Sequence, residues 1–274
     1  MLFVWISCIA HAQAPDSAAS YMSRAKLHYA QGEFDKAIED FDAAIAFNPR
    51  NAAAYCNRAL VWQAKGDLDR AISDYDMAIE IDPLFSESYN NRGNARLARG
   101  DVEGALADYT RAILIRPRDA EALYNRANIR RDRGDLDGAI LDYTASIKSN
   151  PRLVEAYNNR GNARYAKGDI DGAFADYSNA IRLNPRVAFN FNGRGNTRMS
   201  KGDVDGAIAD YSKAIGVDPQ FADAYANRGL ALLIRGKTLE AERDFEQSLR
   251  IDPTLGPSLK ERVMKAKVRD KTSH

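Results

Sequence analysis

The amino-acid sequence predicts an all-α solenoid built from antiparallel helix pairs, and three observations support this prediction. A glycine recurs every 34 residues, and a proline recurs with the same period. The phrase NNRGNARLARGDVEGALADY, which begins at Asn90, returns almost unchanged as NNRGNARYAKGDIDGAFADY at Asn158. A fixed period of this length is typical of stacked repeat proteins. The two periodic sets are Gly32, Gly66, Gly100, Gly134, Gly168, Gly202 and Gly236, and Pro49, Pro83, Pro117, Pro151, Pro185, Pro219 and Pro253.

Residues 1–14 precede the first repeat and differ from the rest of the chain. An apolar run from Leu2 to Ala10 leads into small residues at Ala12 and Ala14, as in the hydrophobic region and cleavage site of a secretory signal peptide. The basic segment that usually begins such a peptide is missing, and the run is too short to span a bilayer. We expect export to the periplasm or the outside. The alternatives are a buried or frayed N-terminus in a cytoplasmic protein, or a lipid anchor at Cys8.

Each unit of 34 residues is predicted to form two helices, as residues 86–119 illustrate. The first helix is expected over residues 87–98 and ends at Gly100, because glycine tolerates the left-handed backbone of a helix C-cap. Asp101 is expected to cap the second helix, and Pro117 to end it. The short connection at Gly100 makes the two helices antiparallel. One buried stripe is predicted for Val102, Leu106, Tyr109 and Ile113.

These units resemble the tetratricopeptide repeat (TPR) family. Its pattern has an aromatic and a small residue in the first helix, then alanine, an aromatic residue, alanine and proline in and after the second. One unit supplies Tyr89, Gly93, Ala105, Tyr109, Ala112 and Pro117. The resemblance implies a right-handed superhelix whose first helices line a concave groove. Seven units, called repeats 1 to 7 below, are expected at residues 18–51, 52–85, 86–119, 120–153, 154–187, 188–221 and 222–255.

A single helix pair cannot be stable alone. Ordering one repeat costs about 50 kcal/mol, which requires on the order of 2,000 Å² of buried apolar surface, so stacking on neighbours must supply the burial. Residues 256–274 follow the last repeat and carry a narrow apolar stripe at Leu259, Val263 and Ala266 among basic residues. We expect a helix that caps the end of the solenoid. The alternative is a basic tail that meets a membrane surface or an acidic partner.

The composition excludes several classes of protein. With 45% hydrophobic and 28% charged residues, the chain is globular rather than disordered or embedded in a membrane. A net charge of +1 argues against a nucleic-acid partner. The two cysteines and three histidines provide no disulfide framework, metal site or nucleophile–base group, and no phosphate-binding loop is present. We therefore expect no enzymatic activity, no cofactor and no metal.

Two charged columns recur in every repeat, an arginine in the first helix and an aspartate sixteen residues later in the second. A charge on the packed side of a helix pair is costly unless it is paired, so we expect structural ion pairs within a repeat or across to the next. A row of anion-binding arginines is the alternative. The central columns contain Arg58, Arg92, Arg126 and Arg160, and Asp74, Asp108, Asp142 and Asp176.

Asparagines fill three further columns of the first helices, two that are adjacent in sequence and one that follows them by a helical turn. By the TPR resemblance these columns face the groove, where an amide can donate to and accept from the backbone of an extended peptide. The alternative, left open here, is that the amides bridge neighbouring first helices and stabilise the stack. The candidate groove residues are Asn57, Asn90, Asn91, Asn94, Asn125, Asn128, Asn158, Asn159, Asn162, Asn192, Asn196 and Asn227.

Two functions follow from these patterns. The favoured one is a non-catalytic scaffold or adaptor that binds a peptide or protein segment in the concave groove. The alternative is a structural protein that self-associates in an envelope-associated assembly. An enzyme subunit whose chemistry lies in a partner is a third, weaker interpretation.

Overall fold

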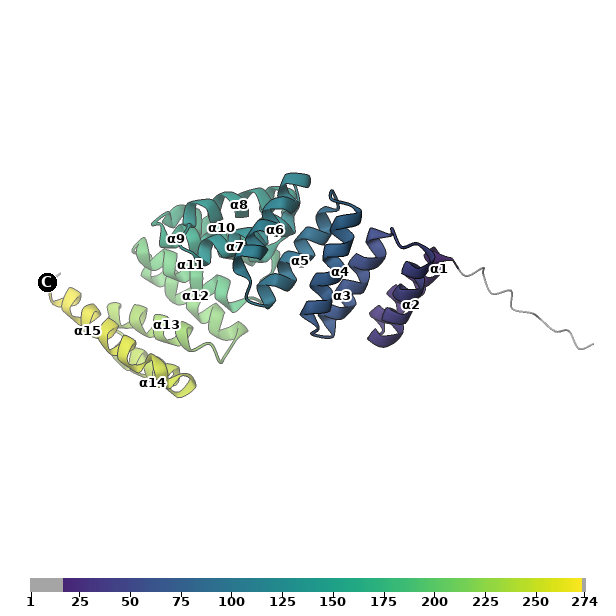
Figure 1. Ribbon diagram of the computed structural model, residues 1–274. Helices are drawn as coiled ribbons and strands as arrows, with labels where there is room; N and C mark the ends of the chain where they lie inside the picture. The colour runs from purple at the N-terminus through teal and green to yellow at the C-terminus, as the bar shows by residue number, and fades with distance from the viewer. Residues whose placement is uncertain (1–16, 273–274) are drawn as a thin grey trace, which may run out of the picture. The chain divides into compact units, whose positions relative to one another are not determined.

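A computed structural model describes residues 17–272, with side chains described for residues 17–265. The predicted leader therefore lies outside the described residues. Within them the chain is helical, with one 3₁₀ turn and no strand, and Figure 1 shows the helices in order. The helices of repeats 1 to 3 are α1 (Ala18–Ala30), α2 (Phe34–Phe47), α3 (Ala52–Ala64), α4 (Leu68–Ile81), α5 (Ser86–Ala98) and α6 (Val102–Ile115).

The remaining helices continue the same alternation to the end of the chain. They are α7 (Ala120–Asp132), α8 (Leu136–Ser149), α9 (Val154–Ala166), α10 (Ile170–Leu183), α11 (Ala188–Ser200), α12 (Val204–Val217), α13 (Ala222–Ile234), α14 (Thr238–Ile251), the 3₁₀ turn η1 (Pro253–Leu255) and α15 (Gly256–Thr272). The chain forms two compact units, one up to Ala122 and one from Leu123. We call them the N-terminal and C-terminal units.

The helix boundaries follow from the periodic residues. Gly168, which ends the first helix of repeat 5, has a φ of 84°, in the left-handed region that glycine alone adopts without strain. Asp169 caps α10, its Oδ1 accepting the backbone N–H of Gly172 at 2.9 Å. A Cβ on Gly172 would collide with the carboxylate of Asp169. This explains the glycines early in the second helices, because they let the capping aspartate lie close to the helix.

Core clusters join one helix pair to the first helix of the next repeat. In the N-terminal unit, Ala59 of α3, Tyr75 of α4 and Ala95 of α5 are all fully buried in one cluster. In the C-terminal unit, Ala127, Tyr143 and Ala156 form the equivalent cluster of α7, α8 and α9. Stacking on neighbours therefore supplies the burial that a single pair lacks.

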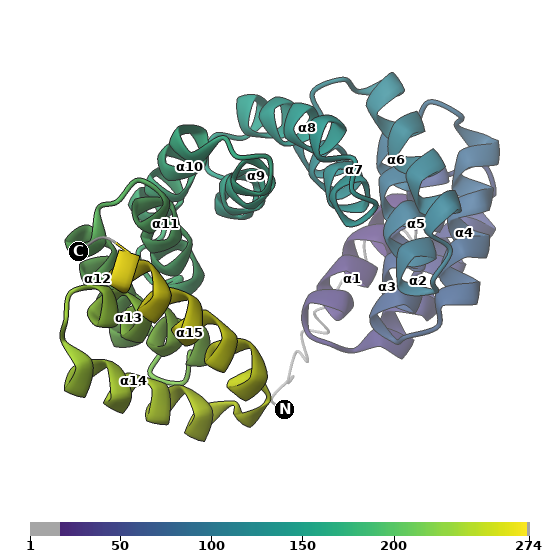
Figure 2. The same ribbon diagram turned by 90° about the vertical axis from the view of Figure 1, so that its left-hand side faces the viewer.

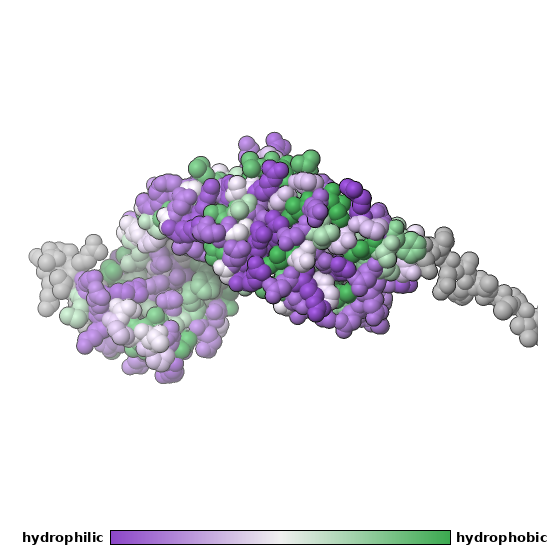
Figure 3. Space-filling view, viewed as in Figure 1, coloured by the Kyte–Doolittle hydropathy of each residue, from purple (hydrophilic) through white to green (hydrophobic). Residues whose placement is uncertain are grey.

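The sequence analysis predicted a fully buried stripe on the second helix of repeat 3, and this prediction is correct only for Tyr109. Val102, Leu106 and Ile113 are only half-buried, whereas Ala105 and Ala112 are fully buried beside Tyr109. Small residues occupy the closest contacts because the packed helices lie near one another. On the face seen in Figure 3, hydrophilic residues surround small, separate hydrophobic patches.

Within the C-terminal unit the first helices form an inner layer and the second helices an outer layer (Figure 2). The inner helices α9, α11 and α13 contact one another in sequence. Helix α15 packs on α13, where Leu259 lies in a cluster with Ala226 and Leu230. The all-α solenoid of antiparallel pairs with a C-terminal capping helix is thus confirmed. Between residues 17 and 272, no helix is both long and apolar enough to span a membrane.

Candidate functional site

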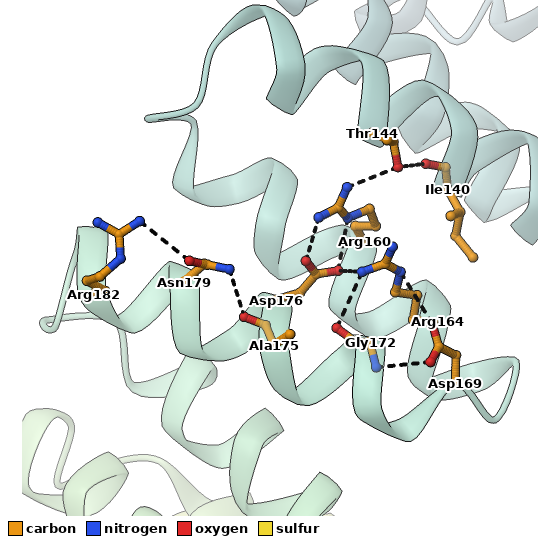
Figure 4. A network of polar contacts seen from close by, with 10 residues as sticks. All are labelled: Ile140, Thr144, Arg160, Arg164, Asp169, Gly172, Ala175, Asp176, Asn179 and Arg182. Atoms are coloured by element: carbon orange, nitrogen blue, oxygen red, sulfur yellow. Dashed lines mark hydrogen bonds and ion pairs between the residues drawn. The ribbon is translucent and has the colours of Figure 1, made fainter.

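The arginine and aspartate columns meet within each repeat. In repeat 5, Nε and Nη2 of Arg160 donate to the two carboxylate oxygens of Asp176 at 2.9 and 2.6 Å. Figure 4 shows this bidentate contact between α9 and α10. The Asp176 side chain is 1% exposed and that of Arg160 is 11% exposed. The same contact joins Arg58 to Asp74, Arg92 to Asp108, Arg126 to Asp142, Arg194 to Asp210 and Arg228 to Asp244.

A second arginine, which the sequence analysis did not single out, completes the contact in repeats 3 to 6. Nη1 of Arg164 donates to Oδ2 of Asp176 at 2.9 Å and lies 3.4 Å from the carbonyl of Gly172. Its position, four residues after the first arginine, could have indicated a shared partner, since such residues lie on one helix face. The equivalent arginines are Arg96, Arg130 and Arg198, each of which forms an ion pair with the aspartate of its own repeat.

The first arginine also reaches back to the preceding repeat. Nη1 of Arg92 contacts Oδ1 of Asp76 at 2.5 Å, and Nη1 of Arg160 donates to the hydroxyl of Thr144 at 3.0 Å. Hydrogen bonding to Asp74 raises the pKa of Arg58 against the opposing effect of burial. These guanidinium groups are occupied by the chain's own oxygens. The geometry therefore favours structural ion pairs over a row of anion-binding arginines.

A separate set of exposed ion pairs links successive repeats, and the sequence analysis did not predict it. In five repeats the residue before the turn glycine pairs with an aspartate thirty residues earlier, as in Arg99 with Asp69 at 3.0 Å and Lys201 with Asp171 at 2.7 Å. Lys65, Lys167 and Arg235 make the same contact with Asp35, Asp137 and Asp205. The charges are missing at the two ends of the array. The cation column has Gln31 in repeat 1, and the acid column has Leu239 in repeat 7.

In the two adjacent asparagine columns, several side chains bridge neighbouring first helices. Nδ2 of Asn158 on α9 donates to Oδ1 of Asn190 on α11 at 2.6 Å, and Nδ2 of Asn227 on α13 donates to Oδ1 of Asn192 at 2.9 Å. Asn159 donates to Tyr124 and to Asn128. In the N-terminal unit, Asn91 lies 4.0 Å from Sγ of Cys56, and Asn57 donates to the carbonyl of Ala53. Asn90 is buried, and Asn125 is half-buried. Several of these amides therefore stabilise the stack.

The third asparagine column, one helical turn further on, is oriented by buried tyrosines of the second helices. The Tyr211 hydroxyl donates to Oδ1 of Asn196 at 2.8 Å, and the Tyr177 hydroxyl donates to Oδ1 of Asn162 at 2.7 Å. Tyr109 and Tyr143 do the same for Asn94 and Asn128. Burial raises the pKa of Tyr211 and Tyr177. The tyrosines were predicted only as core residues, although their constant separation of fifteen residues from an asparagine was visible in the sequence.

On the first helices of the C-terminal unit, three half-buried asparagines keep a free donor. Asn128, Asn192 and Asn196 each accept hydrogen bonds at Oδ1, and among the residues that the structure describes their Nδ2 atoms donate none. All three side chains are half-buried. An amide whose oxygen is already engaged is held in one orientation, so its N–H groups are pre-oriented for an acceptor such as a peptide carbonyl. We call these three residues the free-donor row.

The described residues offer little for catalysis. Cys56 is 3% exposed, and burial raises its pKa, which disfavours the reactive thiolate. Nδ1 of His28 is engaged in a hydrogen bond with Oε2 of Glu33 at 2.5 Å. No group of histidine, cysteine and acidic side chains in residues 17–265 is arranged to hold a metal. An open pocket of about 330 Å³ between α12 and repeat 7 is lined by residues of both charges, including Arg228, Lys237, Glu240 and Asp244.

Comparison with protein families gives one consistent result. Family models described as "TPR repeat" match residues 93–130, 127–168 and 195–236. Models described as "Tetratricopeptide repeat" match residues 22–84, 75–107, 154–187 and 222–255. Together these matches cover well over half of the chain. A comparison with curated proteins gave no match.

Solved structures share the fold. YrrB, described as "a TPR protein with an unusual peptide-binding site", is 23% identical, with a TM-score of 0.60 over 67% of this chain and 95% of that one. MamA is 27% identical, with a TM-score of 0.56 over 60% and 96%. The C-terminal part of a TPR repeat-containing protein from Cytophaga hutchinsonii is 17% identical, with a TM-score of 0.67 over 85% and 96%. The chain therefore belongs to the tetratricopeptide repeat family.

Proposed function

We propose that this protein is a non-catalytic adaptor whose inner layer of first helices binds an extended peptide or protein segment. The free-donor row is the observation on which the proposal depends. Asn128, Asn192 and Asn196 offer amide N–H groups whose orientation is fixed by Tyr143, Asn227 and Tyr211. Peptide carbonyls and carboxylates are the matching acceptors. YrrB has a peptide-binding site by its description, so the fold can carry one, although at 23% identity that likeness extends to the fold alone.

Pre-organisation of these donors increases the free energy that each can contribute to binding. A neutral hydrogen bond contributes about 0.5–1.5 kcal/mol net, and an amide already held by a buried tyrosine loses little side-chain entropy on binding. Such donors recognise the backbone of a partner without reading its sequence. Specificity must then come from the side chains that differ between repeats.

The alternative, a self-assembling structural protein, is less well supported. End-to-end stacking of two copies would place repeat 7 against repeat 1, as consecutive repeats stack within the chain. The exposed inter-repeat ion pairs would then need an acid at position 239 and a cation at position 31, but Leu239 and Gln31 stand there. In addition, α15 packs on α13 at the end of the array. Sedimentation velocity tests this: we expect one species of about 30 kDa or slightly less at all concentrations, and growth with concentration would favour assembly.

The adaptor proposal is tested by removing the donors without removing the acceptors. The double variant Asn192→Asp/Asn196→Asp keeps an oxygen for Asn227 and Tyr211 but replaces each free Nδ2 with a carboxylate oxygen. The control Asn179→Asp makes the same change on α10 of the outer layer, where Asn179 donates to the carbonyl of Ala175. Quantitative affinity capture from an extract of the source cell should lose its specific partner with the double variant and keep it with the control. Equal recovery by all three forms would contradict the proposal.

We also propose that the protein is exported, on the basis of the apolar leader that precedes the first repeat. Intact-mass spectrometry of the native protein gives a direct readout. We expect the mature chain to begin after Ala12 or Ala14. A native protein that retains Met1 would exclude cleavage at these sites.

A further inference from the structure

Helix α11 presents one solvent-facing row of side chains to the inner side of the C-terminal unit. Phe189, Asn192, Asn196 and Met199 follow the spacing i, i+3, i+7 and i+10, which places them on one helix face. Each of them is exposed or half-buried, whereas Asn190, Phe191, Gly193, Gly195 and Thr197 are buried. The row therefore combines two members of the free-donor row with an aromatic side chain near the helix N-terminus.

Phe189 is unusual for its position. Its side chain is 64% exposed, and its ring lies 4.5 Å from that of Phe221, measured between centroids, at a tilt of 46°. Phe221 is itself 8% exposed, so it supports Phe189 from below without covering it. Exposed aromatic rings held by a buried neighbour are typical anchors of interfaces. At the same position the other repeats carry Ala19, Ala53, Glu87, Glu121, Glu155 and Asp223.

Two acids on the neighbouring helices flank this ring. Glu155 occupies the same position on α9 and Asp223 on α13, and both are exposed. Within the part of the chain that the structure describes, neither carboxylate makes a hydrogen bond or ion pair. In contrast, the exposed acids between repeats, such as Asp69 and Asp171, are paired with cations of the chain. In the order of the three inner helices, Phe189 thus stands between two carboxylates that are free to pair with a partner.

The spacing of the three helices predicts how many residues separate successive contacts in the sequence of a bound partner. Helices α9, α11 and α13 contact one another in order (Figure 2), and packed helices lie about 8–10 Å apart. An extended chain in the polyproline II conformation has three residues per turn and rises about 3.1 Å per residue, so residues three positions apart lie on one face and span the distance from one helix to the next. A segment that crosses the three helices meets an acid, an apolar ring and an acid at intervals of about three residues.

We propose that the inner layer binds an extended segment in which an apolar residue is flanked, three positions away on each side, by lysine or arginine. The apolar side chain packs on Phe189, the two cations pair with Glu155 and Asp223, and backbone carbonyls accept from Nδ2 of Asn192, one turn along α11. The pattern is symmetric, so the segment can bind in either chain direction. This inference rests on the proposed adaptor function and names the class of partner.

Synthetic peptides test the pattern directly. The probe is a fluorescein-labelled peptide with the core Lys-Ser-Ser-Leu-Ser-Ser-Lys, and its comparators replace both lysines with glutamate, replace leucine with serine, or place the lysines next to the leucine. Binding is measured by fluorescence anisotropy with the full-length mature protein. We expect the probe to bind at least about tenfold more tightly than each comparator. Its affinity should also fall with added salt, because the ion pairs are exposed.

Matched variants locate the contact on the protein. Phe189→Ala should weaken probe binding by about tenfold or more, because most of the ring is exposed and available for burial. The control Leu141→Ala removes a side chain that is 70% exposed on the outer helix α8 and should leave binding unchanged. Glu155→Gln/Asp223→Asn should weaken binding roughly threefold to tenfold and reduce its salt dependence. The control Glu242→Gln/Glu246→Gln neutralises two exposed acids of α14 and should have no effect.

Specific outcomes overturn the inference. It fails if Phe189→Ala binds the probe as tightly as the parent, if the comparators bind equally well, or if the probe does not bind at about 1 mM. Circular dichroism of each variant confirms that it is folded. If Asn192→Asp/Asn196→Asp abolishes capture of a partner while Phe189→Ala leaves that capture intact, the adaptor function stands and only the partner class is wrong.

Discussion

Replacing Asp176 with alanine leaves two guanidinium groups of α9 without their shared carboxylate. Arg160 loses two hydrogen bonds to Asp176, at 2.9 and 2.6 Å, and Arg164 loses one at 2.9 Å. The Arg160 side chain is 11% exposed and that of Arg164 is 23% exposed, so water reaches both groups only in part. The variant therefore strands two positive charges against a packed helix pair.

The expected cost follows from this geometry. Removing one partner of a buried ion pair costs about 3–5 kcal/mol because the remaining charge stays desolvated. Arg160 keeps its contact with Thr144, and Arg164 keeps an ion-pair distance of 3.5 Å to Asp169, so the cost should lie near the lower end. We expect Asp176→Ala to destabilise repeat 5 by about 3 kcal/mol. The control Asp171→Ala makes the same charge change on α10, but that side chain is 86% exposed, and its pair with Lys201 should contribute less than about 1 kcal/mol.

The assay must resolve one repeat, because repeat arrays do not always unfold in a single step. Urea unfolding gives the midpoint and slope for each variant, and native-state hydrogen exchange reports the opening of α9 and α10 separately. A loss of about 3 kcal/mol speeds exchange through local opening by about 150-fold. If Asp176→Ala and Asp171→Ala lowered stability equally, by less than about 1 kcal/mol, the claim that these ion pairs are buried and structural would be refuted.

Two further predictions concern the packing of the tyrosine column. Burial raises the pKa of Tyr211 above its unfolded value of about 10, so its contribution to stability is complete below that pH and is lost as the pH rises through the folded pKa. Urea midpoints at stepped alkaline pH should fall less steeply for Tyr211→Phe, and an identical slope would contradict this. Gly195→Ala places a Cβ 2.5 Å from Cε1 of Tyr211 and should cost about 1–3 kcal/mol. In the control Gly216→Ala, on α12, the added Cβ meets no atom within 4 Å. This variant should raise the melting temperature, because alanine favours a helix by up to about 1 kcal/mol over glycine. A loss of stability in the control would show that helix propensity is not the dominant effect there.

The fold could be predicted from the sequence because the same turn glycine and the same proline recur in all seven repeats and predict the same helix boundaries each time. Gly168 and Asp169 mark the turn of repeat 5, and in the structure they lie between the end of α9 at Ala166 and the start of α10 at Ile170. The choice of buried stripe was less accurate. Ala105 and Ala112 are buried more deeply than Leu106, because close packing of helices selects small side chains and not only apolar ones.

The candidate site could be predicted only in part. The asparagine columns were visible, but the sequence could not tell which amide oxygens are engaged. That depends on contacts across fifteen or thirty-five residues, such as Tyr211 with Asn196 and Asn227 with Asn192. The acids in the column of Phe189 indicated an exposed position, but the sequence could not show that the ring packs on Phe221. Differences between repeats, rather than their shared pattern, therefore locate the proposed partner contact.

The most direct test of the account follows the side-chain amide protons of the free-donor row by nuclear magnetic resonance. Peptides selected from a random library for binding to the mature protein serve as ligands, so that no pattern is assumed in advance. The account predicts that they shift the side-chain amide signals of Asn192 and Asn196 while those of Asn179, on the outer layer, stay unchanged. Tight-binding peptides that shift Asn179 and leave Asn192 and Asn196 unchanged would contradict the claim that the inner layer binds the partner.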